Sequence, residues 1–283
     1  MPTRRSFLVG GTGVAALAAL RGSVLQAAVA TMQKSDTAAV TRLSDGWEYL
    51  QGTMGGAWEV WHSEETAVWS KVAMPHSFNA YDACDPDTPY YMGNGWYRTH
   101  VVVANPYADG RTLLHFEGAG QTAKVYVGSH LVGEHRGGYD EFVVDITDAV
   151  AELAKAPVAA KEKAKEVAGV PIAVLCDNSR DLDRIPSDLS DFSLYGGMYR
   201  HVNLVYVPAV SLSRVHVKTE IATPDAEAKV TVLGTTYAPG GAAGKVKFSV
   251  AVQDTAGKVV HRATGLVGVQ EAEQELVRLL DPA

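Results

Sequence analysis

The chain has 283 residues, of which 47% are hydrophobic. That is enough for one large or two modest domains with a sizeable core, and it excludes wholesale disorder. The formal net charge of −7 argues against the basic face that a nucleic-acid or anionic-membrane surface needs, and it is compatible with a neutral ligand such as a sugar.

The first thirty residues have the pattern of an export signal. Arg4 and Arg5 precede an apolar run over residues 9–20, and Ala28-Val29-Ala30 supplies a small-x-small cleavage site. A membrane anchor is the less favoured alternative, because a spanning helix needs roughly 20 apolar residues. The sequence therefore predicts a twin-arginine signal over residues 1–30, export to the periplasm or beyond, and no membrane contact by the mature protein.

After this signal, short runs rich in Val, Tyr, Trp and Thr alternate with turns rich in Gly, Pro, Asn and Asp, which is typical of β-strands. Expected strands cover residues 96–103, 111–117, 123–127, 142–146, 172–176 and 201–207, with a hairpin over 125–139. Strands this short and this regularly punctuated predict an all-β jelly-roll sandwich and not alternating β/α units.

One stretch interrupts the β pattern. Residues 148–167 are rich in Ala, Lys and Glu, which are good helix formers, but Pro157 cannot sit comfortably inside a helix. We expect a surface insertion that carries a short helix with a solvated charged face.

The β pattern resumes after Pro208-Ala209. Expected strands cover residues 210–221, 228–237, 245–254, 258–266 and 276–280, and their spacing suits an immunoglobulin-like sandwich. Such a domain typically needs about 100 residues, and fewer follow the boundary. We therefore expect a first domain over 31–208 and an incomplete immunoglobulin-like sandwich over 209–283.

The two cysteines are expected to be free thiols. Export would allow a disulfide, but Cys84 lies in a polar loop and Cys176 ends an apolar run. A zinc site would need more clustered ligands than this pair provides.

Aromatic and amide side chains are dense in the loop before the strand at 96. Aromatic faces pack on the C–H face of a sugar, and amides hydrogen-bond its hydroxyls, so Asn79 and Tyr91 are candidate sugar ligands. For Tyr81, Tyr90 and Tyr91, core packing is an equally favoured interpretation. Trp96 and Tyr97 lie inside the strand and are expected to be core.

The hairpin carries His130 and His135, which suit metal binding or acid–base chemistry only with a third group nearby. Without one, a structural role is favoured. Glycines 133, 137 and 138 are not followed by a helix, so a phosphate-binding loop is not supported.

Five aspartates lie on the long loop after the strand at 172–176. Three interpretations are open. Asp181 and Asp183 suggest calcium, although the required third ligand and glycine are missing. One carboxylate could instead recognise sugar hydroxyls, or the aspartates could serve turns and caps.

Three stretches, in order, resemble the N-terminal sugar-binding domain of glycoside hydrolase family 2, which includes β-galactosidases, β-glucuronidases and β-mannosidases. They are Tyr91-Met92-Gly93-Asn94-Gly95-Trp96-Tyr97-Arg98; the hairpin from Val125 to Tyr139 with Phe142 and Asp145-Ile146-Thr147; and Asp177-Asn178 and Asp191-Phe192 followed by Tyr195-Gly196-Gly197-Met198-Tyr199-Arg200. The likeness runs from about Trp47 to Val207, and the insertion at 148–167 departs from it.

The resemblance implies a galactose-binding-like jelly roll, then an immunoglobulin-like domain, then a (β/α)₈ barrel. In that family one jelly-roll aspartate reaches the sugar in the barrel's active site, and Asp191 is the matching residue. Asn79 and Tyr91 would border the same pocket. The resemblance implies no cofactor.

The catalytic groups of that family are not expected in this chain. A retaining glycosidase needs two carboxylates about 5–5.5 Å apart, and the family places both as glutamates on a barrel of about 250 residues. Glu271, Glu273 and Glu275 alternate along one expected strand and would share one face, with no opposing wall.

We therefore expect a non-catalytic portion of an exported retaining β-glycosidase, β-galactosidase-like, whose partners are carbohydrate and an absent barrel domain. A stand-alone carbohydrate-binding module and a metal-dependent enzyme built on the aspartate loop are the alternatives.

Overall fold

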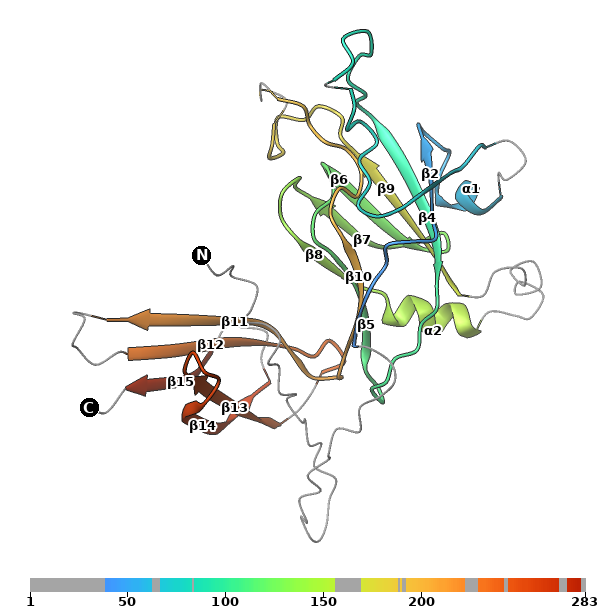
Figure 1. Cartoon of the computed structure of the whole chain (residues 1–283). Coiled ribbons are helices and arrows are strands. Elements are labelled where there is room, and N and C mark those ends of the chain that lie inside the picture. Colours follow the sequence, from blue (N-terminus) through green and yellow to red (C-terminus); the bar gives the residue numbers. More distant parts are fainter. Residues whose placement is uncertain are drawn as a thin grey trace. The chain divides into compact units, whose positions relative to one another are not determined.

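The computed structural model describes residues 39–62, 67–82, 84–155, 169–187, 189, 192–221, 229–241 and 244–269, and the backbone of 274–280. Within these ranges strands make up most of the regular structure, beside two short helices, and every strand pair is antiparallel. The predicted all-β class is confirmed. Two compact units divide between Val207 and Pro208 (Figure 1).

The first unit contains two sheets. The larger has the order β3-β2-β4-β9-β6-β7, and the smaller has the order β1-β10-β5-β8. Their strands are β1 (Val40–Arg42), β2 (Trp47–Gln51), β3 (Ser70–Val72), β4 (Asn94–Val101), β5 (Arg111–Phe116), β6 (Thr122–Val127), β7 (His130–Arg136), β8 (Phe142–Asp145), β9 (Val170–Asp177) and β10 (Val202–Val207). The six strands and the hairpin expected before Pro208 are all present, within a few residues of their expected bounds.

The main core lies between these two sheets. Alternate residues of each strand point inward, so Tyr97 and Val174 of the larger sheet belong to the same buried cluster as Leu114, Phe116 and Leu204 of the smaller one. Such residues are fully or almost fully removed from water, and this burial is the main term that stabilises the unit.

A second, smaller cluster covers the outer face of the larger sheet. Helix α1 (Ala57–His62) packs Ala57 and Val60 onto Trp96 of β4 and Ala173 of β9. Trp96 and Tyr97 are consecutive and point to opposite faces, so β4 supplies an aromatic ring to each cluster. Both rings are buried, which confirms their expected core role.

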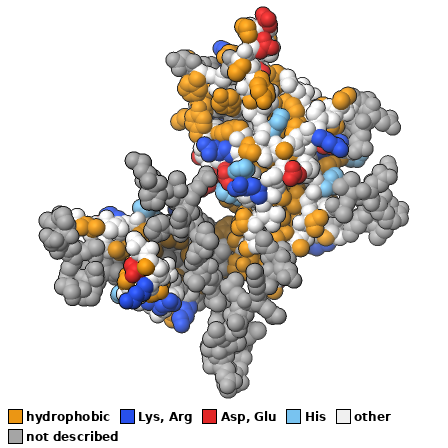
Figure 2. Space-filling model, viewed as in Figure 1, with side chains coloured by type: hydrophobic (Ala, Val, Ile, Leu, Met, Phe, Trp, Pro, Cys, Tyr) orange, Lys and Arg blue, Asp and Glu red, His pale blue; other side chains and the backbone are white. Residues whose placement is uncertain are grey.

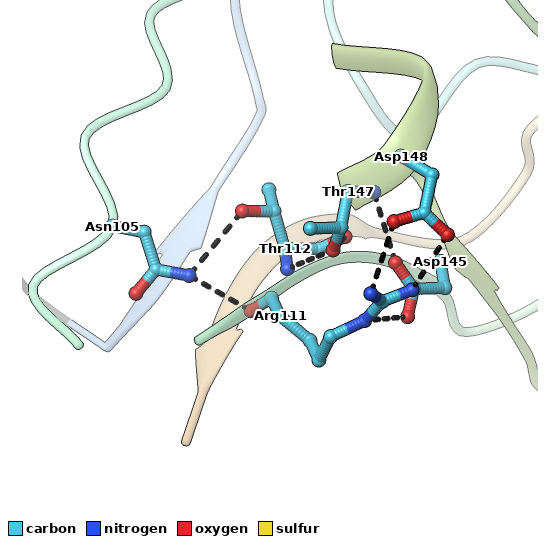
Figure 3. Close-up of polar contacts among 6 residues, drawn as sticks. All are labelled: Asn105, Arg111, Thr112, Asp145, Thr147 and Asp148. Carbon is cyan, nitrogen blue, oxygen red and sulfur yellow. Dashed lines mark hydrogen bonds and ion pairs between the residues drawn. The ribbon is translucent and has the colours of Figure 1, made fainter. Parts of the chain in front are cut away.

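The first turn of helix α2 (Thr147–Lys155) is fixed by an arginine at the start of β5 (Figure 3). Arg111 Nε donates to Asp145 Oδ2 (2.7 Å), and its two terminal nitrogens donate to both oxygens of Asp148 (3.1 and 3.2 Å). The Thr112 N–H donates to the Thr147 hydroxyl (2.8 Å). The helix is thereby joined to the sandwich at its amino end; residues 156–167 of the expected insertion lie outside the described residues.

Replacement of Arg111 by alanine is expected to lower the free energy of unfolding by about 1–3 kcal/mol, because it removes charge-assisted bonds that are partly shielded from water. Urea unfolding followed by tryptophan fluorescence measures the change. The matched control is Arg42→Ala, whose guanidinium is 53% exposed and pairs with Glu117 at 3.4 Å. Its effect should stay within about 0.5 kcal/mol, and equal losses in the two variants would contradict the argument.

The second unit also consists of two sheets. Strands β11 (Ser211–Glu220), β12 (Lys229–Tyr237) and β15 (Gln274–Leu280) form one, and β13 (Lys245–Gln253) pairs with β14 (Val259–Gly268) in the other. Val232 of β12 packs among Phe248, Val250 and Ala263 of the second sheet. The five strands expected here are present.

Both cysteines are free. Cys84 is exposed in the loop before β4, whereas Cys176 is fully buried between the sheets, and burial raises the pKa of its thiol. The expected signal, residues 1–30, lies outside the described residues, and no helix in the described part of the chain has the length and hydrophobicity to cross a membrane.

Candidate functional site

Two buried asparagines join the loops at one end of the first unit. Asn79 belongs to the loop before β4, and Asn178 begins the loop between β9 and β10; their exposed fractions are 2% and 0%. Both side-chain amides donate to the same two carbonyls. The Leu194 oxygen lies 2.8 Å from Asn79 Nδ2 and 3.0 Å from Asn178 Nδ2, and the Tyr91 oxygen lies 3.4 and 3.0 Å from them. The two loops are therefore held as one structure.

The side chain of Asn79, which the sequence predicts to contact sugar, makes its hydrogen bonds inside the protein. Besides its two donated bonds, its Oδ1 accepts from the Gly196 N–H (2.9 Å) and the Ser77 hydroxyl (3.1 Å). All four hydrogen-bonding positions of the amide are thus used inside the protein. In the structure Asn79 positions the loop, and its direct contact with a sugar stays a prediction.

Tyr91 is partly buried at the same place. Its hydroxyl donates to the Asn94 carbonyl (2.8 Å), and its ring meets Phe78 edge to face at 5.5 Å. Burial raises the pKa of Tyr91, so the phenol stays protonated and can donate. Its backbone N–H donates to Asp82 Oδ2 (2.7 Å), which fixes the turn before β4.

Two glycines let the β9–β10 loop approach the core closely. A Cβ on Gly196 would collide with the Phe78 ring. Gly197 has φ +101°, and a Cβ there would collide with the Tyr97 hydroxyl and the His76 carbonyl. The Gly-Gly pair of the sequence motif therefore has a packing reason, because any side chain would push the loop off the asparagine brace.

The third predicted site residue, Asp191, lies outside the described residues. The described residues of these loops present a largely apolar surface, which we call the loop face. Its exposed side chains are Tyr81, Tyr90, Tyr139, Leu182, Ile185, Leu189, Phe192 and Tyr195. Figure 2 shows hydrophobic side chains gathered at the upper end of the first unit, where these loops lie. The exposure of Tyr81 and Tyr90 agrees with the binding interpretation of these two tyrosines and not with core packing.

The other candidate groups are engaged in local contacts. His135 stacks on Phe142 (ring centroids 4.2 Å apart) and lies 3.3 Å from Asp140, a structural arrangement. Asp181 accepts from the Asp183 N–H (2.9 Å) and pairs with Arg184 (2.8 Å), which is turn chemistry. No group of three potential metal ligands occurs within the described ranges.

A half-buried histidine beneath the Gly-Gly pair makes stability depend on pH. His76 Nδ1 and the Tyr97 hydroxyl are hydrogen-bonded at 2.9 Å, and burial lowers the pKa of His76 from 6.5. Between the lowered pKa and 6.5 the unfolded chain binds more protons than the folded one. Stability should therefore fall as the pH drops below about 6.5, by at most about 1.4 kcal/mol per pH unit.

Melting temperatures between pH 7.5 and 5, followed by tryptophan fluorescence, measure this effect. As the pH is lowered, the melting temperature of His76→Gln should fall less steeply than that of the parent chain. His130→Gln, which changes an exposed histidine, should keep the parent slope. The same slope in the parent and in His76→Gln would contradict the proposed titration.

The family model described as "Glycosyl hydrolases family 2, sugar binding domain" matches residues 48–208, which include every element of the site above. The chain belongs to glycoside hydrolase family 2. The β-glucuronidase of Parabacteroides merdae is 42% identical, with a TM-score of 0.79 over 86% of this chain and 31% of that one. The β-glucuronidase 3 of Bacteroides uniformis is 40% identical, with a TM-score of 0.74 over 86% and 30%.

A curated relative is also named as a β-glucuronidase. The putative β-glucuronidase of Formosa agariphila is 32% identical over 167 residues, which are 59% of this chain and 18% of the relative. The chain thus spans less than a third of the length of these family 2 proteins. The resemblance drawn from the three sequence stretches is confirmed.

Sequence reasoning missed the role of Asn178. The Asp177-Asn178 pair was recognised only as part of a family 2 motif, although a signal for bracing was present: an amide directly after an apolar strand cannot be buried without partners. Phe78, against which both Tyr91 and Gly196 pack, was also not singled out.

Proposed function

We propose that this chain is the sugar-binding, non-catalytic N-terminal portion of an exported retaining β-glycosidase. The observation that carries the proposal is the family 2 sugar-binding match over residues 48–208, in a chain that covers less than a third of the two solved β-glucuronidases named above. The braced loop face supports it, because a binding surface made of loops needs a rigid scaffold beneath it.

In this proposal a (β/α)₈ barrel, not contained in these residues, supplies the two catalytic glutamates. The loop face borders the barrel's active site, and Asp191 accepts hydrogen bonds from sugar hydroxyls there. A role for Asp191 in proton transfer is not proposed. No cofactor is required, because general acid and nucleophile are both carboxylates in this chemistry.

The sugar that the complete enzyme would release is a separate question. The sequence favoured a β-galactosidase-like enzyme, whereas the solved relatives at 40–42% identity are named β-glucuronidases. This likeness supports β-glucuronides as the second candidate substrate class. Curated relatives named β-galactosidase, such as that of Thermoanaerobacter pseudethanolicus at 32% identity over 158 residues, keep the first class open.

The test compares hydrolysis of p-nitrophenyl β-galactoside and β-glucuronide by this chain and by the chain extended through any barrel encoded directly downstream. The chain alone should be inactive, and the extended protein should hydrolyse one of the two. Asp191→Ala in the extended protein should lower kcat/KM at least about 100-fold, because it leaves substrate hydroxyls unpaired. The control is Asp183→Ala on the same loop, which should retain activity.

Hydrolysis by the chain alone would refute the non-catalytic assignment. An intact stop codon with no barrel nearby would support the alternative of a stand-alone carbohydrate-binding module. Export is tested by fusing residues 1–30 to a reporter: replacing both Arg4 and Arg5 by lysine should keep the reporter in the cytoplasm.

A further inference from the structure

A pocket lies beside α1 on the outer face of the larger sheet, on the opposite side from the main core. Its volume is about 730 Å³, within the range of small-molecule sites. We call it the α1 pocket; it is lined by Asp45, Gly46, Trp47, Glu48, Trp61, Lys71, Val72, Ala73, Arg98, Thr99 and His100. The β4 residues of the pocket, Arg98 to His100, come four to six positions after Asn94, roughly 13–20 Å along the strand from the loop face. The α1 pocket is therefore separate from the loop face.

Part of the lining is rigidly held. Arg98 Nε donates to Glu48 Oε2 (2.7 Å), and Nη1 donates to the Val60 carbonyl (2.8 Å). Its guanidinium also lies 4.3 Å from the centre of the Trp69 ring. Because three contacts fix this arginine, the Glu48 carboxylate beside it is fixed as well. Preorganised polar groups of this kind bind a ligand with little loss of side-chain entropy.

The charges of the lining are mixed. Lys71 and Asp45 are exposed, whereas Glu48 and Arg98 are partly buried. A phosphate would meet the two carboxylates and a metal cation would meet the basic groups, so either is disfavoured. A neutral ligand whose hydroxyl groups both donate and accept hydrogen bonds fits both kinds of group.

Aromatic rings adjoin these polar groups. The Trp61 side chain is fixed by its Nε1 bond to the Gly128 carbonyl (2.9 Å), and its ring meets His100 at 5.2 Å. Trp58, one helical turn earlier, is 60% exposed and stacks on His62 with ring centroids 3.9 Å apart. Trp61 thus lines the pocket with a fixed ring, and Trp58 presents an exposed ring on the same helix.

We propose that the α1 pocket, together with the exposed Trp58 of the same helix, is a second carbohydrate-binding site that takes a neutral oligosaccharide. Sugar C–H faces stack on the tryptophan rings, and hydroxyls bond to Glu48 and Lys71. This goes beyond the proposed function, because such a site would hold a polysaccharide without contributing to its cleavage.

Fluorine NMR of the chain labelled with 5-fluorotryptophan tests the site. The five tryptophans are Trp47, Trp58, Trp61, Trp69 and Trp96, and single Trp→Phe changes assign their signals. The probes are cellopentaose, laminaripentaose and β-1,4-galactotetraose, each titrated to 10 mM. At least one should shift the Trp58 and Trp61 signals saturably, whereas Trp96, which is 3% exposed and does not line the pocket, should not respond.

Substitutions then locate the binding. Trp58→Ala and Lys71→Ala change exposed side chains and should leave the fold intact, while at least one of them should weaken binding about tenfold. Val143→Ala, which changes an exposed residue of the other sheet, should bind as the parent does. No saturable shift with any probe, or unchanged affinity in both variants, would overturn the proposal. It would equally be overturned if Phe192→Ala abolished binding while Trp58→Ala did not, since binding would then lie on the loop face.

Discussion

Alanine in place of Asn178 is expected to lower the free energy of unfolding of the first unit by about 3 kcal/mol. The side chain is fully buried and accepts from the Gly93 N–H (2.8 Å) while it donates to two carbonyls. Its removal leaves that N–H without its side-chain partner inside the protein, and a buried unsatisfied group costs about 1–3 kcal/mol beyond the lost bonds. Urea unfolding followed by tryptophan fluorescence suits the measurement, because all five tryptophans belong to this unit.

The matched control is Asn203→Ala. Asn203 is also buried, with 6% exposed, but its side chain makes one long bond, to Glu117 at 3.4 Å. Its loss should cost less than about 1 kcal/mol. The double variant Asn79→Ala, Asn178→Ala should be non-additive, because the two amides share both acceptor carbonyls. If Asn178→Ala and Asn203→Ala lowered the free energy of unfolding equally, Asn178 would not hold the two loops together as argued.

Alanine at Gly197 is expected to be at least about 2 kcal/mol more destabilising than alanine at Gly52. Both glycines have a left-handed φ, +101° and +111°, so both substitutions incur a similar backbone strain. They differ in space: a Cβ on Gly197 collides with Tyr97 and His76, whereas a Cβ on Gly52 meets nothing within 4 Å. The difference between the two variants therefore isolates the cost of overpacking, which is typically about 1–3 kcal/mol.

The same urea titration gives both free energies. Tyr97→Phe removes the hydroxyl that the new methyl group would strike, so in that background the difference between the two alanine variants should shrink. If Gly197→Ala were no worse than Gly52→Ala, the close approach of the β9–β10 loop to the core would be wrong.

The strands were predictable because their signal is local. The runs that became β4, β5, β9 and β10 contain apolar residues at the spacing that a sandwich buries, bounded by turn residues. No such pattern marks β1, β3 and α1, which have three, three and six residues and are too short to establish a period. These three elements form because β1 and β3 pair with neighbouring strands and α1 covers the larger sheet.

The site was less predictable, because its contacts are distant in sequence. The bond from Asn79 to the Leu194 carbonyl spans 115 residues, and no local pattern indicates it. The sequence shows that the loop before β4 is dense in aromatic and amide side chains. Which of them face a ligand and which brace the loops depends on tertiary packing, and the structure assigns bracing to Asn79.

The different exposure of the two thiols allows the opening rate of the first unit to be measured by chemical modification. A maleimide should modify Cys84 at once, since it is exposed, whereas Cys176 at the centre of the sandwich can react only when the sheets separate. After Cys84 is blocked, the rate at which mass spectrometry detects the second adduct reports how often the whole β-sandwich opens under native conditions.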